Sequence, residues 1–146
     1  MYSLKGSLIT AGYLPHRFSL SRKSGHIVTK ALINGHKGRF IIDTGASTCC
    51  VDQTLYKEFK LTTEFMDREI GTASGSLRPR ISHHNVLELG DWGDGDVSVL
   101  TMDMGFINRA LAVEGMRTVQ GLLGADFLIG SRAIIDYGGK KLYLKP

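Results

Sequence analysis

The sequence is poor in cysteine and proline, and it contains no long hydrophobic run. Its two cysteines, Cys49 and Cys50, are neighbours. Adjacent Cα atoms lie about 3.8 Å apart, closer than the roughly 4.4–6.8 Å that a disulfide spans, so no disulfide framework is expected. Residues 1–20 intersperse polar residues with short apolar pairs and show neither a signal-peptide core nor a transmembrane stretch. If Met1 is the natural start, we expect a cytoplasmic protein without membrane contact.

The charged residues also lack the pattern of a nucleic-acid-binding surface. Lysine and arginine number 18 and aspartate and glutamate 14, which gives a net charge of +4, and the basic residues are spread along the whole chain. Nucleic-acid surfaces usually gather basic residues into a stripe among aromatic ones. No such stripe is visible, so no nucleic-acid partner is expected.

The length and the glycine content predict one mostly β domain. A chain of 146 residues is expected to form a single domain. Its 18 glycines are about 12% of the residues, against an average near 7%, which favours tight turns between short strands. Regular patterns begin at Gly25. We therefore divide the chain into an N-terminal extension or edge strand, residues 1–24, and a domain, residues 25–146.

Hairpins and short helices are expected along this domain. Asn34-Gly35 is a strong hairpin signal between two apolar runs, and the turn-rich residues 90–96 separate two further strands. Asp52 is expected to cap a short helical segment. The expected strands are residues 26–32, 39–42, 85–89, 97–101, 119–123, 133–136 and 141–144, and residues 104–116 and 125–129 suit short helices.

A carboxylate follows a fully apolar strand in the string F-I-I-D-T-G-A-S, residues 40–47. Asp43 loses solvation at the end of such a strand, and backbone N–H groups can compensate if Gly45 permits a sharp turn. On its own, this pattern fits a purely structural turn as well as a catalytic loop.

A second apolar segment near the C-terminus makes the pattern more specific. The string L-L-G at residues 122–124 leads straight into an expected helix and then into two terminal strands. Together with D-T-G, it resembles the retropepsin-like aspartic proteases, particularly their bacterial single-domain members, over roughly residues 25–145. In that family, two apolar residues and a glycine end the segment that crosses the D-[ST]-G loop. The resemblance assigns this structural role to Leu122, Leu123 and Gly124.

The resemblance implies an acid-protease barrel with one or two short helices that is active as a homodimer and needs no cofactor. The chain holds one D-T-G, and no other aspartate is followed by threonine or serine and then glycine. The second carboxylate of the family's dyad would therefore be Asp43 of another copy. Two ionised carboxylates about 3 Å apart repel by about 5 kcal/mol at an effective dielectric constant of about 20. As in known aspartic-protease dyads, the pair would share one proton near neutral pH.

By the same resemblance, the chain is an aspartic endopeptidase that acts on polypeptides. One Asp43 takes a proton from water while its protonated mate donates a hydrogen bond to the scissile carbonyl oxygen. Thr44 would fix the two loops across the dimer axis, and Gly45 would let the substrate backbone approach. By position, the glycine-bracketed hairpin of residues 70–76 would form the flap that closes over a peptide, although its sequence also fits a plain surface hairpin. The residues expected to contact substrate are Ala46, Ser47, Ile70, Gly71, Thr72, Ala73, Ser74 and Gly75.

Other chemistry-bearing residues do not form a competing site in the sequence. His83 and His84 are neighbours, and adjacent side chains on a strand would point to opposite faces. No cysteine or histidine cluster supports them, so no metal site is predicted. Cys49 has no positioned histidine beside it and suits a small buried residue better than a nucleophile. Asp126 opens a helix, where we expect a structural role as a cap or in an inter-subunit ion pair.

A different class of function stays open at this stage. A retropepsin-like module can bind peptide or mediate dimerisation without hydrolysis, because related folds can lose activity and keep their shape. The intact D-T-G favours the enzyme, since a pure scaffold has no need for a carboxylate at the end of a buried strand.

Overall fold

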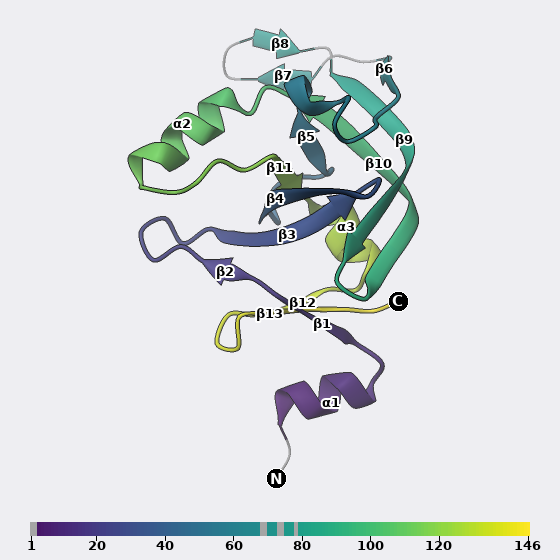
Figure 1. Ribbon diagram of the computed structural model, residues 1–146, viewed down its shortest axis with the longest axis vertical. Coiled ribbons are helices and arrows are strands. Elements are labelled where there is room, and N and C mark those ends of the chain that lie inside the picture. The colour runs from purple at the N-terminus through teal and green to yellow at the C-terminus, as the bar shows by residue number, and fades with distance from the viewer. Residues whose placement is uncertain (1–2, 68–69, 73–74, 78) are drawn as a thin grey trace.

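A closed ring of six β-strands forms the body of the chain, and short helices lie around it (Figure 1). The computed structural model describes residues 3–67, 70–72, 75–77 and 79–146. In chain order its elements are α1 (Leu4–Thr10), β1 (Leu14–Arg17), β2 (Ser19–Leu20), β3 (Ile27–Ile33), β4 (His36–Ile42), β5 (Cys50–Asp52), the 3₁₀ turn η1 (Gln53–Leu55), β6 (Thr63–Phe65), β7 (Ile70–Thr72), β8 (Gly75–Leu77), β9 (Arg80–Leu89), β10 (Trp92–Met102), α2 (Gly105–Val113), β11 (Gly121–Leu123), α3 (Ala125–Gly130), β12 (Ile134–Asp136) and β13 (Lys141–Leu144).

The ring follows the strand order β3-β4-β11-β5-β10-β9, and β9 pairs back with β3 to close it. Strand β2 attaches to β3 outside the ring, and β6 attaches to β9. Strands β1, β13 and β12 form a separate three-stranded sheet, and β7 and β8 form a two-stranded hairpin. The mostly β barrel that the sequence predicts is therefore confirmed.

The first hairpin lies where the asparagine–glycine pair predicts it. Strands β3 and β4 are antiparallel along their whole length. Asn34 and Gly35 between them have φ values of 51° and 80°, the left-handed conformation that a type I′ turn requires. Asn34 also ties the turn to β9, because its Nδ2 donates to Asn85 Oδ1 (2.9 Å) and its Oδ1 accepts from the Val86 N–H (2.9 Å).

The second hairpin turns more sharply than the sequence indicates. A turn was expected over residues 90–96, but β10 already begins at Trp92, so that prediction is wrong for residues 92–96. Gly90 makes the tight turn with a φ of 58°. The ladder between β9 and β10 shifts register beyond Asp94. Such bulges let a strand absorb a glycine- and aspartate-rich segment without ending.

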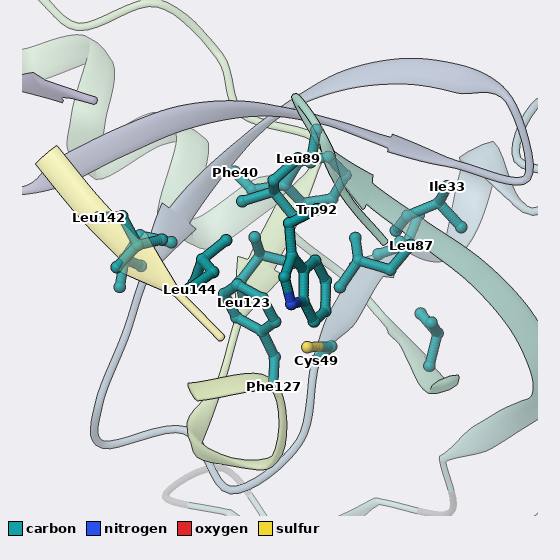
Figure 2. Packing of buried hydrophobic residues seen from close by; sticks show 14 of the residues in the cluster. Ile33, Phe40, Cys49, Leu87, Leu89, Trp92, Leu123, Phe127, Leu142 and Leu144 are labelled. Atoms are coloured by element: carbon teal, nitrogen blue, oxygen red, sulfur yellow. The ribbon is translucent and has the colours of Figure 1, made fainter. Parts of the chain in front are cut away.

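Alternate residues of the ring strands fill two apolar clusters. Phe40 of β4 points into the larger cluster, shown in Figure 2, whereas Ile41 belongs to a smaller one covered by α2. Trp92, whose place the sequence leaves open, is buried in the larger cluster. Its ring packs edge-on against Phe127 with 5.2 Å between centroids, and its Nε1 donates to the Lys145 carbonyl oxygen (3.0 Å).

The helices partly follow the sequence predictions. Helix α2 lies inside the segment expected for it, and α3 begins where expected and ends one residue later, at Gly130. The Asp52 carboxylate accepts from the Thr54 N–H (2.8 Å) at the start of η1. Helix α1 was not expected. It buries none of its residues and lies at the opposite end of the molecule from the β7–β8 hairpin (Figure 1). No helix of the described residues is long and apolar enough to span a membrane.

Strands β1 and β2 of the first 24 residues pair with β13 and β3. His16 of β1 is half-buried beside β3, and its Nε2 lies 2.9 Å from the Lys30 carbonyl oxygen. Burial lowers the pKa of His16 below its usual value of 6.5, against the smaller opposing effect of that hydrogen bond. The folded chain therefore holds His16 neutral more strongly than the unfolded chain does.

We expect His16 to make the protein less stable in acid. Below about pH 6.5 the unfolded chain takes up a proton that the folded chain resists, so this stability is present above that pH and is lost as the pH falls through the lower folded-state pKa. The variant His16→Gln keeps a donor for the Lys30 carbonyl and should show a shallower loss of unfolding free energy between about pH 8 and pH 5. Urea denaturation measures this loss. His26→Gln, which replaces an exposed histidine, should behave as wild type.

Candidate active site

Asp43 follows the last residue of β4 and lies half-buried at the end of that strand. Strand β3 borders β4 on one side and β11 borders it on the other, so the chain leaving β4 has a defined position. The Asp43 N–H donates to the Leu123 carbonyl oxygen (3.0 Å). This bond extends the β4–β11 ladder up to the carboxylate.

The loop after Asp43 is closed by its own hydrogen bonds. The Gly45 N–H donates to Asp43 Oδ1 (2.9 Å), and the Ala46 N–H donates to the Asp43 carbonyl oxygen (3.2 Å). Thr44, Gly45 and Ser47 are exposed, whereas Asp43 and Ala46 are only partly so. One carboxylate oxygen is thus engaged by the backbone of its own loop, and the side chain sits at an accessible edge of the ring.

Strand β11 passes between the two strands that flank this loop. It runs parallel to β4, with Leu122 opposite Ile41 and Leu123 opposite Ile42. On its other side it runs antiparallel to β5, with Leu122 opposite Cys50. The structure therefore brings the L-L-G segment directly against the D-T-G loop, although about 80 residues separate them in the chain.

The backbone after β11 is bonded to the loop. The Ala125 N–H donates to the Ala46 carbonyl oxygen (2.7 Å), and the Asp126 N–H donates to that of Ser47 (3.2 Å). Gly124 lies where these two backbones cross. A Cβ atom placed on it would lie 2.6 Å from the Ala46 carbonyl oxygen and 3.0 Å from that of Thr48. Only a residue without a side chain fits this crossing.

Asp126 forms a second link between the loop and α3. Its carboxylate accepts from the Cys49 N–H (3.1 and 3.2 Å) and from the Phe127 N–H (2.7 Å), and the Cys49 thiol lies 3.3 Å from Oδ1. The expected helix-capping role of Asp126 agrees with its bond to Phe127. No pattern in the sequence predicts its bond to Cys49, which lies 77 positions away in the chain.

The two cysteines are buried and free. Burial, with a further contribution from Asp126, raises the pKa of the Cys49 thiol far above its usual range. Burial likewise raises the pKa of Cys50 to about 11, with smaller contributions from Asp126 and then Asp43. Both thiols stay protonated near neutral pH, so neither is an activated nucleophile. The sequence prediction that Cys49 is a small buried residue agrees with this environment.

The hairpin expected to act as a flap forms a two-stranded sheet of its own, outside the ring of six strands. Strands β7 and β8 pair through Ile70 and Leu77, Gly71 and Ser76, and Thr72 and Gly75. Ala73 and Ser74, at the expected tip, lie outside the described residues. Figure 1 shows the hairpin at one end of the ring.

The histidine pair lies away from this loop, on β9. His84 has a φ of 60°, and its Nδ1 lies 2.7 Å from Asp96 Oδ1, while His83 Nδ1 lies 2.8 Å from Ser98 Oγ. Among the residues that the structure describes, no three histidine, cysteine or acidic side chains are placed to hold a metal ion.

Comparison with known families identifies this loop and its surroundings. Residues 29–127 match the family model described as aspartyl protease, a segment that begins within β3 and ends within α3. The chain belongs to the aspartyl protease family. No curated protein sequence matches the chain.

Solved structures show the same fold within this family. A retropepsin-like aspartic protease from Rickettsia conorii is 19% identical, with a TM-score of 0.62 over 91% of this chain and 89% of that one. EIAV protease in complex with the inhibitor HBY-793 is 18% identical, with a TM-score of 0.54 over 77% of this chain and 93% of that one. The aspartyl protease fold of this chain is therefore retropepsin-like, as the two sequence motifs predict.

We expect Gly124→Ala to destabilise the protein by about 2 kcal/mol or more, because the added methyl group meets backbone atoms that cannot move aside without breaking the loop bonds. Gly130→Ala is the matched control. It adds the same methyl group to the last residue of α3, where nothing lies within 4 Å, and should be neutral or stabilising by up to about 1 kcal/mol. Urea unfolding measures both, and equal effects of the two substitutions would contradict the proposed crossing constraint.

Proposed function

We propose that this aspartyl protease family member is an aspartic endopeptidase whose dyad forms from Asp43 of two copies of the chain. The position of Asp43 carries the proposal. Asp43 follows the buried ring strand β4, and its N–H donates to the Leu123 carbonyl oxygen of β11, which fixes the start of the loop. A side chain held this way is oriented before substrate arrives, which general acid–base catalysis requires.

The chemistry follows from two carboxyl groups that share one proton. The ionised Asp43 accepts a proton from a water molecule as the water oxygen attacks the scissile carbonyl carbon. The protonated Asp43 of the other copy donates a hydrogen bond to the carbonyl oxygen and stabilises the negative charge that develops there. The Asp43 that took the proton from the water then donates it to the amide nitrogen, and the C–N bond breaks as the tetrahedral intermediate collapses to a carboxylic acid and an amine. No covalent enzyme intermediate forms.

The neighbouring residues take supporting roles in this proposal. Exposed Thr44 would bond across the dimer axis, and Gly45 would let the substrate backbone approach. Extended polypeptide would lie between the Asp43 loops and the β7–β8 flap and add backbone hydrogen bonds of the β type. The proposed substrate contacts are Ala46, Ser47, Ile70, Gly71, Thr72, Ala73, Ser74 and Gly75.

The surface beside Thr44 supports a second copy. An open cavity of 520 Å³ lies there, lined by Tyr13, Thr44, Ile129 and Arg132 among others. Ile129 of α3, which is 75% exposed, adds an apolar side chain to this cavity. An exposed apolar residue with a polar rim is typical of a protein–protein contact.

We expect Asp43→Asn to reduce cleavage of an unfolded protein substrate by about 10²–10⁴-fold, because an amide cannot accept the proton of the attacking water. Cleavage is followed by electrophoresis over acidic to neutral pH. The control, Asp91→Asn, removes an exposed carboxylate from the β9–β10 turn and should keep wild-type activity. Equal cleavage by wild type and Asp43→Asn would refute the assignment, and no cleavage by wild type would favour the silent peptide-binding or dimerisation module.

If the dyad is shared between two chains, a wild-type chain that pairs with an inactive Asp43→Asn chain should lose its activity. With random pairing, an about ninefold excess of Asp43→Asn chains leaves about one wild-type chain in ten paired with another wild-type chain. Activity at saturating substrate should therefore fall about tenfold at constant wild-type concentration, while an equal excess of an inert protein changes nothing. Sedimentation velocity confirms that the chains pair. Unchanged activity in the mixture would show that one chain suffices.

A further inference from the structure

The outer face of strands β3 and β4 carries a cluster of positive side chains. Lys30 of β3 lies directly opposite Arg39 of β4, and opposite residues of an antiparallel pair project from the same face. The segment before β11 joins them, because Arg39 and Gln120 exchange two bonds: the Gln120 N–H donates to the Arg39 carbonyl oxygen (2.8 Å) and Gln120 Oε1 accepts from the Arg39 N–H (2.7 Å). This pairing brings Arg117 near Arg39.

The Arg39 guanidinium is incompletely satisfied by the protein. Its Nε is the buried side-chain nitrogen or oxygen without a hydrogen-bond partner in the described part of the chain. Burial lowers the pKa of Arg39, and the nearby positive charge of Arg117 lowers it further. Two guanidinium groups therefore lie close together, and the Arg39 Nε is a buried donor without an acceptor. Such a donor costs free energy unless an acceptor binds to it.

A cavity of 260 Å³ lies against this cluster. Three cations, Arg39, Lys30 and Arg17, line it, and no acidic residue does. The other lining residues are His16, Phe18, Ser19, Val28 and Thr29. The side chain of Thr29 is already used, because its Oγ1 donates to the Arg17 carbonyl oxygen (3.0 Å). Apart from Thr29, most of the polar side chains that line the cavity are those of the cations Arg17, Lys30 and Arg39.

No carboxylate of the described residues neutralises these cations. The ion pairs within 4.0 Å in this part of the chain are His83 with Glu64 and His84 with Asp96, on β9, β6 and β10. The acidic residue closest to the cluster in the strand register is Glu88, which lies opposite Leu32 of β3 and takes part in neither pair.

We propose that this cavity, between β1, β2, β3 and β4, binds a phosphate group through Arg39, Lys30 and Arg17, with Arg117 adding positive charge. A dianionic phosphate offers several acceptor oxygens and matches a cavity lined by three cations and no carboxylate. A guanidinium pairs with two oxygens of such a group in a planar fork, and a lysine ammonium adds a point charge. This site is separate from the Asp43 loop, so it does not depend on the proposed protease activity.

The proposal is tested by calorimetric titration of the full chain with inorganic phosphate at about pH 7.5, with the ionic strength held constant by chloride. Wild type should bind, and Arg39→Gln and Lys30→Gln should each weaken binding by about tenfold or more, because each removes a charge-assisted contact. Lys57→Gln is the matched control. It removes the same charge from an exposed residue after η1 and should bind as wild type.

Lys30 is exposed, so Lys30→Gln keeps the test valid even if Arg39→Gln fails to fold. A parallel titration with O-phosphoserine distinguishes free phosphate from a phosphate ester. Tighter binding of the ester than of inorganic phosphate assigns the site to phosphorylated molecules, and the reverse assigns it to the free ion. The proposal is overturned if wild type binds neither probe, or if Lys30→Gln and Lys57→Gln weaken binding equally.

Discussion

The passage of β11 through the Asp43 loop is the constraint on which the rest of the structure depends. Backbone bonds from Asp43, Ala125 and Asp126 join the loop to this segment on both sides of Gly124. Because the backbones approach to a distance that excludes a Cβ atom, the loop has one shape and the carboxylate one position. The ring of strands, the buried cysteines and the start of α3 are all arranged around this crossing.

The same crossing joins the Asp43 loop to helix α3. The Asp126 carboxylate bonds the Cys49 N–H, so the end of the active-site loop and the first turn of α3 form one unit. Since a chain contributes a single D-T-G, the proposed dyad needs two such units facing each other. The proposed phosphate site uses another part of β4, where Arg39 lies on the outer face four residues before Asp43.

Local signals in the sequence predicted much of this fold. The Asn34-Gly35 turn needs two left-handed residues, and few pairs other than asparagine–glycine supply them. The apolar run before Asp43, whose residues Phe40, Ile41 and Ile42 are all buried, likewise reflects local geometry. The extent of the second turn was predicted wrongly, because a bulged strand and a loop share the same glycine- and aspartate-rich composition. Helix α1 buries no residues, so no apolar periodicity reveals it.

By itself, the sequence determined the family, the barrel class and the carboxylate at the end of β4, because two short motifs encode a strand, a turn and a close backbone crossing. The tertiary structure alone decided what those motifs touch. The Asp126–Cys49 bond and the cluster of Arg39, Lys30 and Arg17 join residues that are distant in the chain. Such contacts depend on strand order and register, and closure of the ring sets both.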